Sequence, residues 1–405
     1  DALVLKYDIN GVKVWNQTMH RTANSWGKGI GLDQEKNVYI AGYGYSEIDT
    51  NNALVAKYSP SGELIYNKTW GEQIKPYLGN AIAVNQSGFY YVTGTGVSVE
   101  SFSYLAQFDP NGIHQWNATW GVQSPTDVAI TSLGNPYFIT KLPGAVNYLR
   151  IWGHYPNGTF IEHYDTSFAA NPSGLTADQF GNLYFTGRTY DGDTYANAFL
   201  CKFTPGVGIQ WSKFLDLQYF DEAMDVAVDS GGNIYICGYT RTTVANEIDE
   251  DMFIAKYSPE GVSLWNYTRD LGGVDYARAL KVSDLGDIYV VGSSNFTGNK
   301  DAFIMRLREP NSLPPPQPEL DPISPVWTNT GAIELNWTAV DMADNYSVYR
   351  STQWINTLND TAQFLGTTTD LGMIDQLTDP GQYYYVIFAS NESGEIGRAS
   401  CRERV

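Results

Sequence analysis

Large apolar residues alternate with small or polar residues in short runs along most of the chain, and a turn signal separates the two runs of each pair. The pattern is clearest in residues 251–268, DMFIAKYSPEGVSLWNYT, where a run through Phe253 and Ile254 ends at Ser-Pro-Glu-Gly and a second run carries Trp265. Proline presets φ at the second turn position, and glycine accepts the positive φ that closes a tight turn. The segment therefore predicts a β-hairpin.

This hairpin recurs. Copies are found at residues 2–15, 53–66, 104–116, 150–162 and 198–211, and a partial copy begins at Asp301. A second strand–turn–strand element lies between the copies, at residues 30–43, 82–95, 128–142, 175–189, 226–240 and 280–294. Each period of about 44 to 54 residues thus holds four short strands without helical periodicity, which is typical of one blade of a β-propeller.

The number of blades depends on how the two ends are interpreted. The chain opens with the third and fourth strands of a blade, and the last period has no fourth strand. Either the opening hairpin belongs to a seventh, incomplete blade, or it completes the last one. We therefore expect an all-β fold with a six-to-seven-bladed β-propeller over residues 1–308, and we favour seven blade positions.

The repeat DxxGNxYxxGxT followed by DAFxAKYxPxGxxxW resembles the SBBP-type β-propeller repeats of microbial surface proteins. The resemblance covers residues 1 to about 308 and implies a propeller within a larger cell-surface protein. One period departs from it, with Gly153 where other copies have Lys or Arg and Glu162 where others have an aromatic residue. We expect the recurrent basic residue to be structural, with its stem packed against the blade.

Residues 309–325, EPNSLPPPQPELDPISP, predict a stiff, extended linker because prolines replace the strand alternation. Alternation returns after Val326 and predicts a C-terminal β-sandwich over residues 326–397. This region resembles a fibronectin type III domain, in which Trp337 matches the core tryptophan and Tyr383 the tyrosine corner.

The pattern lacks the last strand of that sandwich. Residues 398–405 are basic and unlike the preceding sequence, which predicts a non-native tail. An edge left without its strand recruits strands from other molecules. We therefore expect self-association through open strand edges, unless residues 395–405 fill the sandwich edge. The propeller ends are expected to close within the chain.

Charge excludes several classes of partner. The formal net charge is −19, which disfavours nucleic acids and anionic membranes, since both select Lys and Arg patches. No apolar run is long enough to cross a membrane, so direct membrane insertion is not expected. Cys201, Cys237 and Cys401 form no disulfide framework, and we expect the first two to be buried apolar residues.

Glycosylation sequons indicate the compartment. Four of them, at Asn16, Asn67, Asn117 and Asn266, directly follow the aromatic residue of the fourth strand, which is the outer edge of a blade. A glycan there would face solvent and block edge-to-edge pairing. We therefore predict an extracellular or cell-surface glycoprotein with eleven acceptor residues: Asn16, Asn67, Asn85, Asn117, Asn157, Asn266, Asn295, Asn336, Asn345, Asn359 and Asn391.

Acidic residues collect in the connections opposite the tight turns, and these connections differ from one period to the next, as binding loops do. Two groups lie on successive blades and are the candidate calcium ligands, because calcium takes about six to eight oxygen ligands: Asp191, Asp193, Glu247, Asp249, Glu250 and Asp251. The competing interpretation is that these are solvated surface acids. The turn residues Asp178 and Asp229 are expected to cap hairpins and not to bind metal.

No catalytic motif is present, and His20, His114, His154 and His163 lack the spacing of a metal site. We expect no catalytic residues and no cofactor other than calcium. The sequence favours a non-enzymatic extracellular surface module that binds an unidentified protein or glycan at its variable loops. The alternative is an enzyme or cofactor-binding propeller similar to quinoproteins, for which the recurrent tryptophan is the one hint.

Overall fold

The computed structural model describes residues 2–19, 25–45, 51–71, 76–97, 101–121, 124–142, 148–189, 196–217, 220–244, 247–283, 285–295, 301–308, 332–337, 344–352, 362–377, 383–391 and 394–402. The chain divides into two compact units, Asp1–Leu307 and Arg308–Val405. The predicted linker, residues 309–325, lies outside the described residues.

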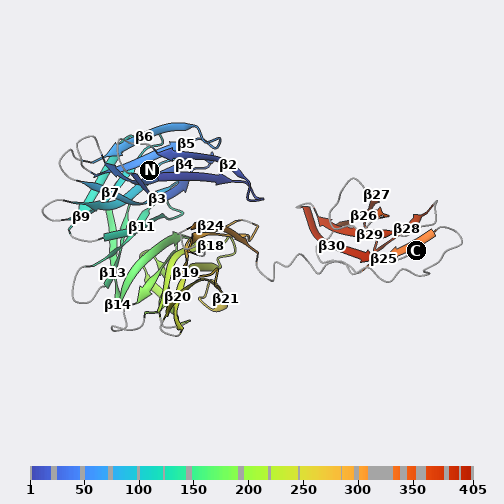
Figure 1. The fold of residues 1–405 in the computed structure, drawn as a ribbon. Coiled ribbons are helices and arrows are strands. Elements are labelled where there is room, and N and C mark those ends of the chain that lie inside the picture. The colour runs from blue at the N-terminus through green and yellow to red at the C-terminus, as the bar shows by residue number, and fades with distance from the viewer. Residues whose placement is uncertain are drawn as a thin grey trace. The chain divides into compact units, whose positions relative to one another are not determined.

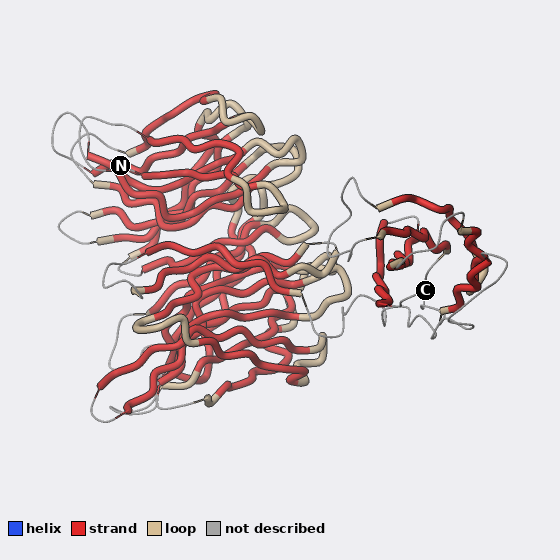
Figure 2. The backbone as a smooth tube through the Cα atoms, turned by 45° about the vertical axis from the view of Figure 1, so that its right-hand side comes forward, coloured by secondary structure: helices blue, strands red, loops and turns tan. Residues whose placement is uncertain are grey.

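The first unit is a propeller built of antiparallel sheets that follow one another along the chain, with no helix in the described ranges (Figures 1 and 2). No described helix could therefore cross a membrane. Within each blade, consecutive strands are hydrogen-bonded neighbours. The complete blades are β3(Ser25–Leu32), β4(Val38–Tyr45), β5(Asn51–Tyr58), β6(Leu64–Trp70); β7(Tyr77–Val84), β8(Tyr90–Gly96), β9(Phe102–Phe108), β10(His114–Trp120); β11(Ser124–Ile130), β12(Pro136–Lys141), β13(Tyr148–His154), β14(Phe160–Ala177); β14, β15(Leu183–Thr189), β16(Ala198–Thr204), β17(Gly208–Leu215); and β18(Phe220–Val228), β19(Ile234–Val244), β20(Glu247–Tyr257), β21(Ser263–Arg269).

Two blades are partial. Strands β22(Asp275–Val282), β23(Ile288–Ser294) and β24(Asp301–Leu307) form a three-stranded sheet, and β1(Ala2–Tyr7) and β2(Lys13–Met19) form a two-stranded sheet. The two sheets are not joined by strand pairing in the described residues, so the opening hairpin does not complete the last blade. It packs on the first complete blade instead, with Ala2, Val4 and Met19 against Val38 and Leu54. This arrangement corresponds to seven blade positions.

The turn between the first and second strands is held by its aspartate. Asp178 accepts the backbone amides of Phe180 and Asn182 through Oδ1 and the Tyr184 hydroxyl through Oδ2. Asp229 makes the equivalent bonds to Asn233 and Tyr235. The expectation that these aspartates cap hairpins is confirmed.

A glycine in the second strand of the blade lets a bulged first strand approach closely. A Cβ added at Gly238 would lie 1.9 Å from the Glu222 carbonyl oxygen, and one added at Gly187 would lie 2.0 Å from that of Asn171. In each case the first strand has a register shift just beyond that carbonyl. The glycine of the sequence repeat is thus required by a β-bulge.

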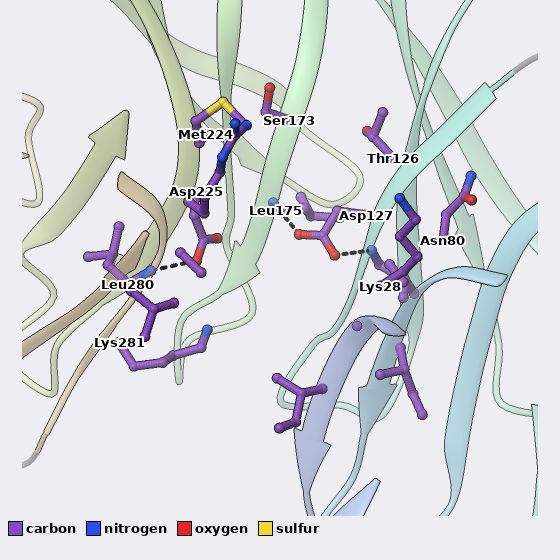
Figure 3. Close-up of a pocket in the computed structure, with 18 of the residues that line it drawn as sticks. Lys28, Asn80, Thr126, Asp127, Ser173, Leu175, Met224, Asp225, Leu280 and Lys281 are labelled. Carbon is purple, nitrogen blue, oxygen red and sulfur yellow. Dashed lines mark hydrogen bonds between the residues drawn. The ribbon is translucent and has the colours of Figure 1, made fainter. Parts of the chain in front are cut away.

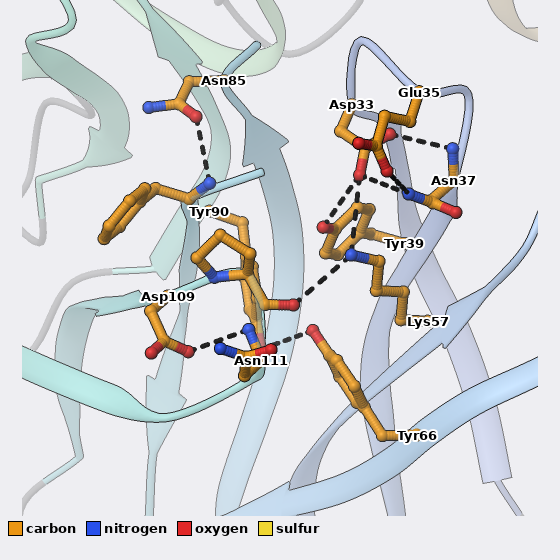
Figure 4. Close-up of polar contacts among 12 residues, drawn as sticks. Asp33, Glu35, Asn37, Tyr39, Lys57, Tyr66, Asn85, Tyr90, Asp109 and Asn111 are labelled. Atoms are coloured by element: carbon orange, nitrogen blue, oxygen red, sulfur yellow. Dashed lines mark hydrogen bonds and ion pairs between the residues drawn. The ribbon is translucent and has the colours of Figure 1, made fainter. Parts of the chain in front are cut away.

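Neighbouring blades meet at a repeated contact, here called the blade joint, in which the third and fourth strands of one blade contact the tight turn of the next. Lys57 lies 4.8 Å above the Tyr39 ring and donates to the Pro110 carbonyl at 3.4 Å (Figure 4). Trp116 Nε1 donates to the Pro156 carbonyl at 2.8 Å, and a Cβ on Gly158 would lie 2.8 Å from the Trp116 ring. The recurrent basic residue is therefore structural, as expected.

The second unit is a β-sandwich. One sheet pairs β25(Ala332–Asn336) with β28(Gly372–Gln376), and the other has the order β27(Gln363–Thr368), β26(Asn345–Ser351), β29(Tyr384–Asn391), β30(Gly394–Arg402). Trp337 is buried in the core between the sheets, beside Tyr346 and Tyr385. The Tyr385 hydroxyl donates to Asp375, while Tyr383 lies under the Arg350 guanidinium.

The expectation that this sandwich lacks its last strand is wrong. Residues 394–402 form β30, and Ser400, Cys401 and Arg402 pair with Val386, Tyr385 and Tyr384. Residues 398–402 of the presumed non-native tail therefore belong to the sheet. They cover the edge of β29, where strand addition by another molecule was expected.

Candidate functional site

The first strands of six blades converge on a cavity of about 460 Å³. Each of these strands has a β-bulge, and a bulge redirects the side chain of its extra residue. All six extra residues line the cavity: Lys28, Asn80, Thr126, Ser173, Met224 and Arg278. The bulged strand is the same in each blade, but these six side chains differ in size and charge. They therefore determine the shape and polarity of the cavity.

Two carboxylates in the cavity wall join successive blades (Figure 3). Asp127 accepts the amides of Val128 and Leu175, and Asp225 accepts those of Val226 and Leu280. Burial and the neighbouring Asp225 raise the pKa of Asp127 to about 7. Burial also raises the pKa of Asp225, and Lys281 opposes that change. Both carboxylates thus accept hydrogen bonds from the backbone of the next blade. Their burial makes the ionised form less favourable than it would be in water.

Cations and apolar residues complete the wall. Lys28, Lys281 and Arg278 are exposed to the cavity, and the Arg278 guanidinium lies 4.3 Å from the Tyr276 ring centroid. Leu175 and Leu280 contribute apolar surface. A cavity with both charges and an apolar wall suits a small polar molecule.

Of the two groups of acidic residues expected in loops, one is not described by the structure and the other lies in a strand. Asp191 and Asp193 lie outside the described residues. Glu247 is in β20, and its side chain is not described. Asp249, Glu250 and Asp251 also lie in β20 and not in a connection, because the ladder with β19 continues to Val244 and Glu247.

These acids do not form one ligand set. Glu250 is buried, accepts Arg241 Nε at 2.7 Å and accepts the Tyr276 hydroxyl, so its carboxylate is already satisfied. Asp249 and Asp251 instead gather with Asp270, and a carboxylate oxygen of each lies within 4.8 Å of the others. The sequence did not place Asp270 among the candidate ligands, because it follows β21 and lies about twenty residues after Asp249 and Asp251 in the chain.

The sequon asparagines occupy varied surroundings. Asn16, Asn117 and Asn266 lie on the outer strands β2, β10 and β21 and are exposed, as are Asn157 and Asn336. Asn67 on β6, together with Asn85, Asn295 and Asn345, is partly buried. Asn359 lies outside the described residues, and Asn391 is in β29 with its side chain not described.

Cys201 and Cys237 are free. Cys201 in β16 and Cys237 in β19 are buried, and burial raises the pKa of the Cys201 thiol to about 12. They behave as small apolar core residues, as expected.

Comparison with known proteins adds two structural neighbours. No family model matches the chain, and no curated protein sequence matches it. A protein of unknown function from Bacteroides caccae aligns with a TM-score of 0.41 at 10% identity, over 64% of this chain and 87% of that one. The Dos1 propeller aligns with a TM-score of 0.41 at 10% identity, over 71% and 78%.

Proposed function

We propose that this chain is a non-enzymatic extracellular surface module, in which an SBBP-type propeller and a fibronectin type III-like sandwich form part of a larger cell-surface protein. The propeller acts as a rigid scaffold for a protein or glycan ligand. The repeated basic and aromatic residues support this role, because Lys57 and Trp116 are used in blade joints and not in a reactive site.

The observation that carries the proposal is the equivalence of Asn16, Asn117 and Asn266. Each is exposed on the outermost strand of its blade, at the same position relative to the preceding tryptophan. Outer strands offer unpaired backbone groups, and a glycan attached there would prevent sheet-to-sheet association. This placement favours a secreted, glycosylated surface.

Mass spectrometry of the protein from its native source tests the proposal. We expect an intact mass above that of the polypeptide and a loss of mass on enzymatic deglycosylation. The triple variant N16Q/N117Q/N266Q should lose three glycans. A wild-type mass equal to the bare polypeptide would contradict the proposal.

The absorbance spectrum of the same native material tests the non-enzymatic part. We expect a spectrum of protein alone. A quinone band would favour the cofactor-binding alternative.

A further inference from the structure

Carboxylates gather where the blade of β18–β21 meets the blade of β22–β24. Asp249 and Asp251 are on β20, and Asp270 follows the end of β21. One carboxylate oxygen from each lies within 4.8 Å of the other two. Asp249 and Asp251 are half-buried, and Asp270 is exposed, so the cluster opens to solvent on one side.

Buried oxygens without partners lie beside this cluster. Glu250 and Val274 form a parallel bridge, so the next residues, Asp251 and Asp275, emerge together on the opposite side. Asp275 is fully buried, and its Oδ1 has no hydrogen-bond partner among the described residues, while its other oxygen accepts the Leu271 amide.

Thr240 adds a third such oxygen. It lies directly opposite Asp251 in the β19–β20 ladder, so the two side chains share a face. Thr240 is 1% exposed, and within the described part of the chain its Oγ1 has no partner, as is also true of Asp251 Oδ1. Buried polar atoms normally have hydrogen-bond partners. Three unpaired oxygens on one face therefore indicate that a further group binds there.

The local charge is not compensated by the described side chains. None of them forms an ion pair with Asp249, Asp251, Asp270 or Asp275, and the neighbouring Arg241 binds Glu250. Several unpaired carboxylates at a partly buried position are costly unless a cation joins them.

The preceding blade junction, where Ala196 bridges Phe220, has the same backbone arrangement with fewer charged side chains. Asp221 accepts the Leu217 amide there, as Asp275 accepts that of Leu271. Asn197 takes the place of Asp251, and its backbone amide donates to Thr189 Oγ1 at 3.2 Å. The fold therefore accommodates the neutral side chain of Asn197 at this position. The charged side chain of Asp251 is specific to the later junction.

We propose that this junction binds one calcium ion, with Asp249, Asp251 and Asp270 as carboxylate ligands and the unpaired oxygens of Asp275 and Thr240 facing the same site. Calcium accepts oxygen ligands at about 2.4 Å, so oxygens on opposite sides of the ion are about 4.8 Å apart. The spread of the three carboxylate oxygens fits within that distance. Water completes the coordination on the exposed side.

Calorimetric titration of the chelator-treated full chain with calcium chloride tests this site. We expect one binding event in the wild type and at least a tenfold weaker one in Asp251→Asn, which reproduces the residue of the preceding junction. Asp216→Asn, at the position there that corresponds to Asp270, is the matched control and should bind calcium like the wild type. An absence of binding by the wild type, or equal binding by Asp251→Asn, would overturn the proposal.

Thermal unfolding provides a second readout. Calcium should raise the Tm of the wild type but not that of Asp251→Asn. Without calcium, the Tm of Asp251→Asn should equal or exceed that of the wild type, because one repulsive charge is gone. If Asp251→Asn does not fold, the exposed Asp270→Asn replaces it with the same expectations. Magnesium binding as tight as calcium binding would overturn the assignment of the ion.

Discussion

The Glu162 carboxylate accepts the backbone amide of Gly206 at 3.0 Å, which reverses the direction of hydrogen bonding at this blade joint. At other joints a side chain donates to the next turn, as Trp15 does to the Pro60 carbonyl at 3.1 Å. Glu162 also accepts the Tyr137 hydroxyl at 2.9 Å. The single carboxylate thus replaces both the basic and the aromatic residue of the repeat.

Replacing Glu162 by alanine should destabilise the propeller by roughly 1 to 3 kcal/mol, because two donors lose their acceptor. Glutamine keeps one acceptor oxygen and should recover part of the loss. Denaturant unfolding measures both. Alanine at the exposed Glu63, whose side chain faces solvent in a tight turn, is the control and should change little.

Two tryptophans at equivalent positions should respond differently to phenylalanine. Trp116→Phe removes the bond to Pro156 and should cost about 1 kcal/mol. Trp265 Nε1 is buried without a partner in the described ranges, and the residues that directly follow β24 and Arg308 lie outside those ranges. Trp265→Phe should therefore be neutral or stabilising in denaturant titrations. Equal losses in the two variants would contradict this account of the joint.

His154 should make the propeller sensitive to acid. It is buried beside Trp120 and Phe138, and burial lowers its pKa to about 4 from an unfolded value near 6.5. Protonation therefore favours unfolding: the histidine's contribution is complete above about pH 6.5 and is lost as pH falls through 4.

Phenylalanine is the natural replacement, since Phe108 and Phe203 occupy the same position in other blades. The stability of His154→Phe relative to the wild type should increase by about 3 kcal/mol between pH 7 and pH 4. Denaturant unfolding at a series of pH values measures that difference. A constant difference across the range would show that His154 is not responsible.

Alanine at Gly238 should destabilise the fold by more than about 2 kcal/mol, because its Cβ would collide with the Glu222 carbonyl oxygen in the bulged first strand. Gly121 is the control. No atom lies within 4 Å of a Cβ there, so Gly121→Ala should stay within about 0.5 kcal/mol of the wild type by thermal or chemical unfolding.

The propeller could be predicted because each blade repeats the same turn and bulge chemistry, visible in Asp178, the strand glycine Gly187 and the Pro-Gly turns. The cavity residues could not be. Lys28 and Arg278 line the cavity because of a register shift between strands, and alternation within one strand does not reveal such a shift.

Two further errors have related causes. The sequence predicted a loop at Glu247 and Asp251 because charged residues are rare in strands. In the structure, the ladder with β19 extends through both residues. The last sandwich strand was missed because residues 398–402 lack apolar alternation, although backbone pairing with β29 needs none.

Strand β14 is continuous over Phe160–Ala177, pairing with β13 through its first part and with β15 through its second. In the other described blades, the fourth strand and the first strand of the next blade are separate elements. A shared backbone ties these two blades into one cooperative unit, so their amides should exchange with deuterium together. Opening either blade would require breaking the strand that also belongs to the other.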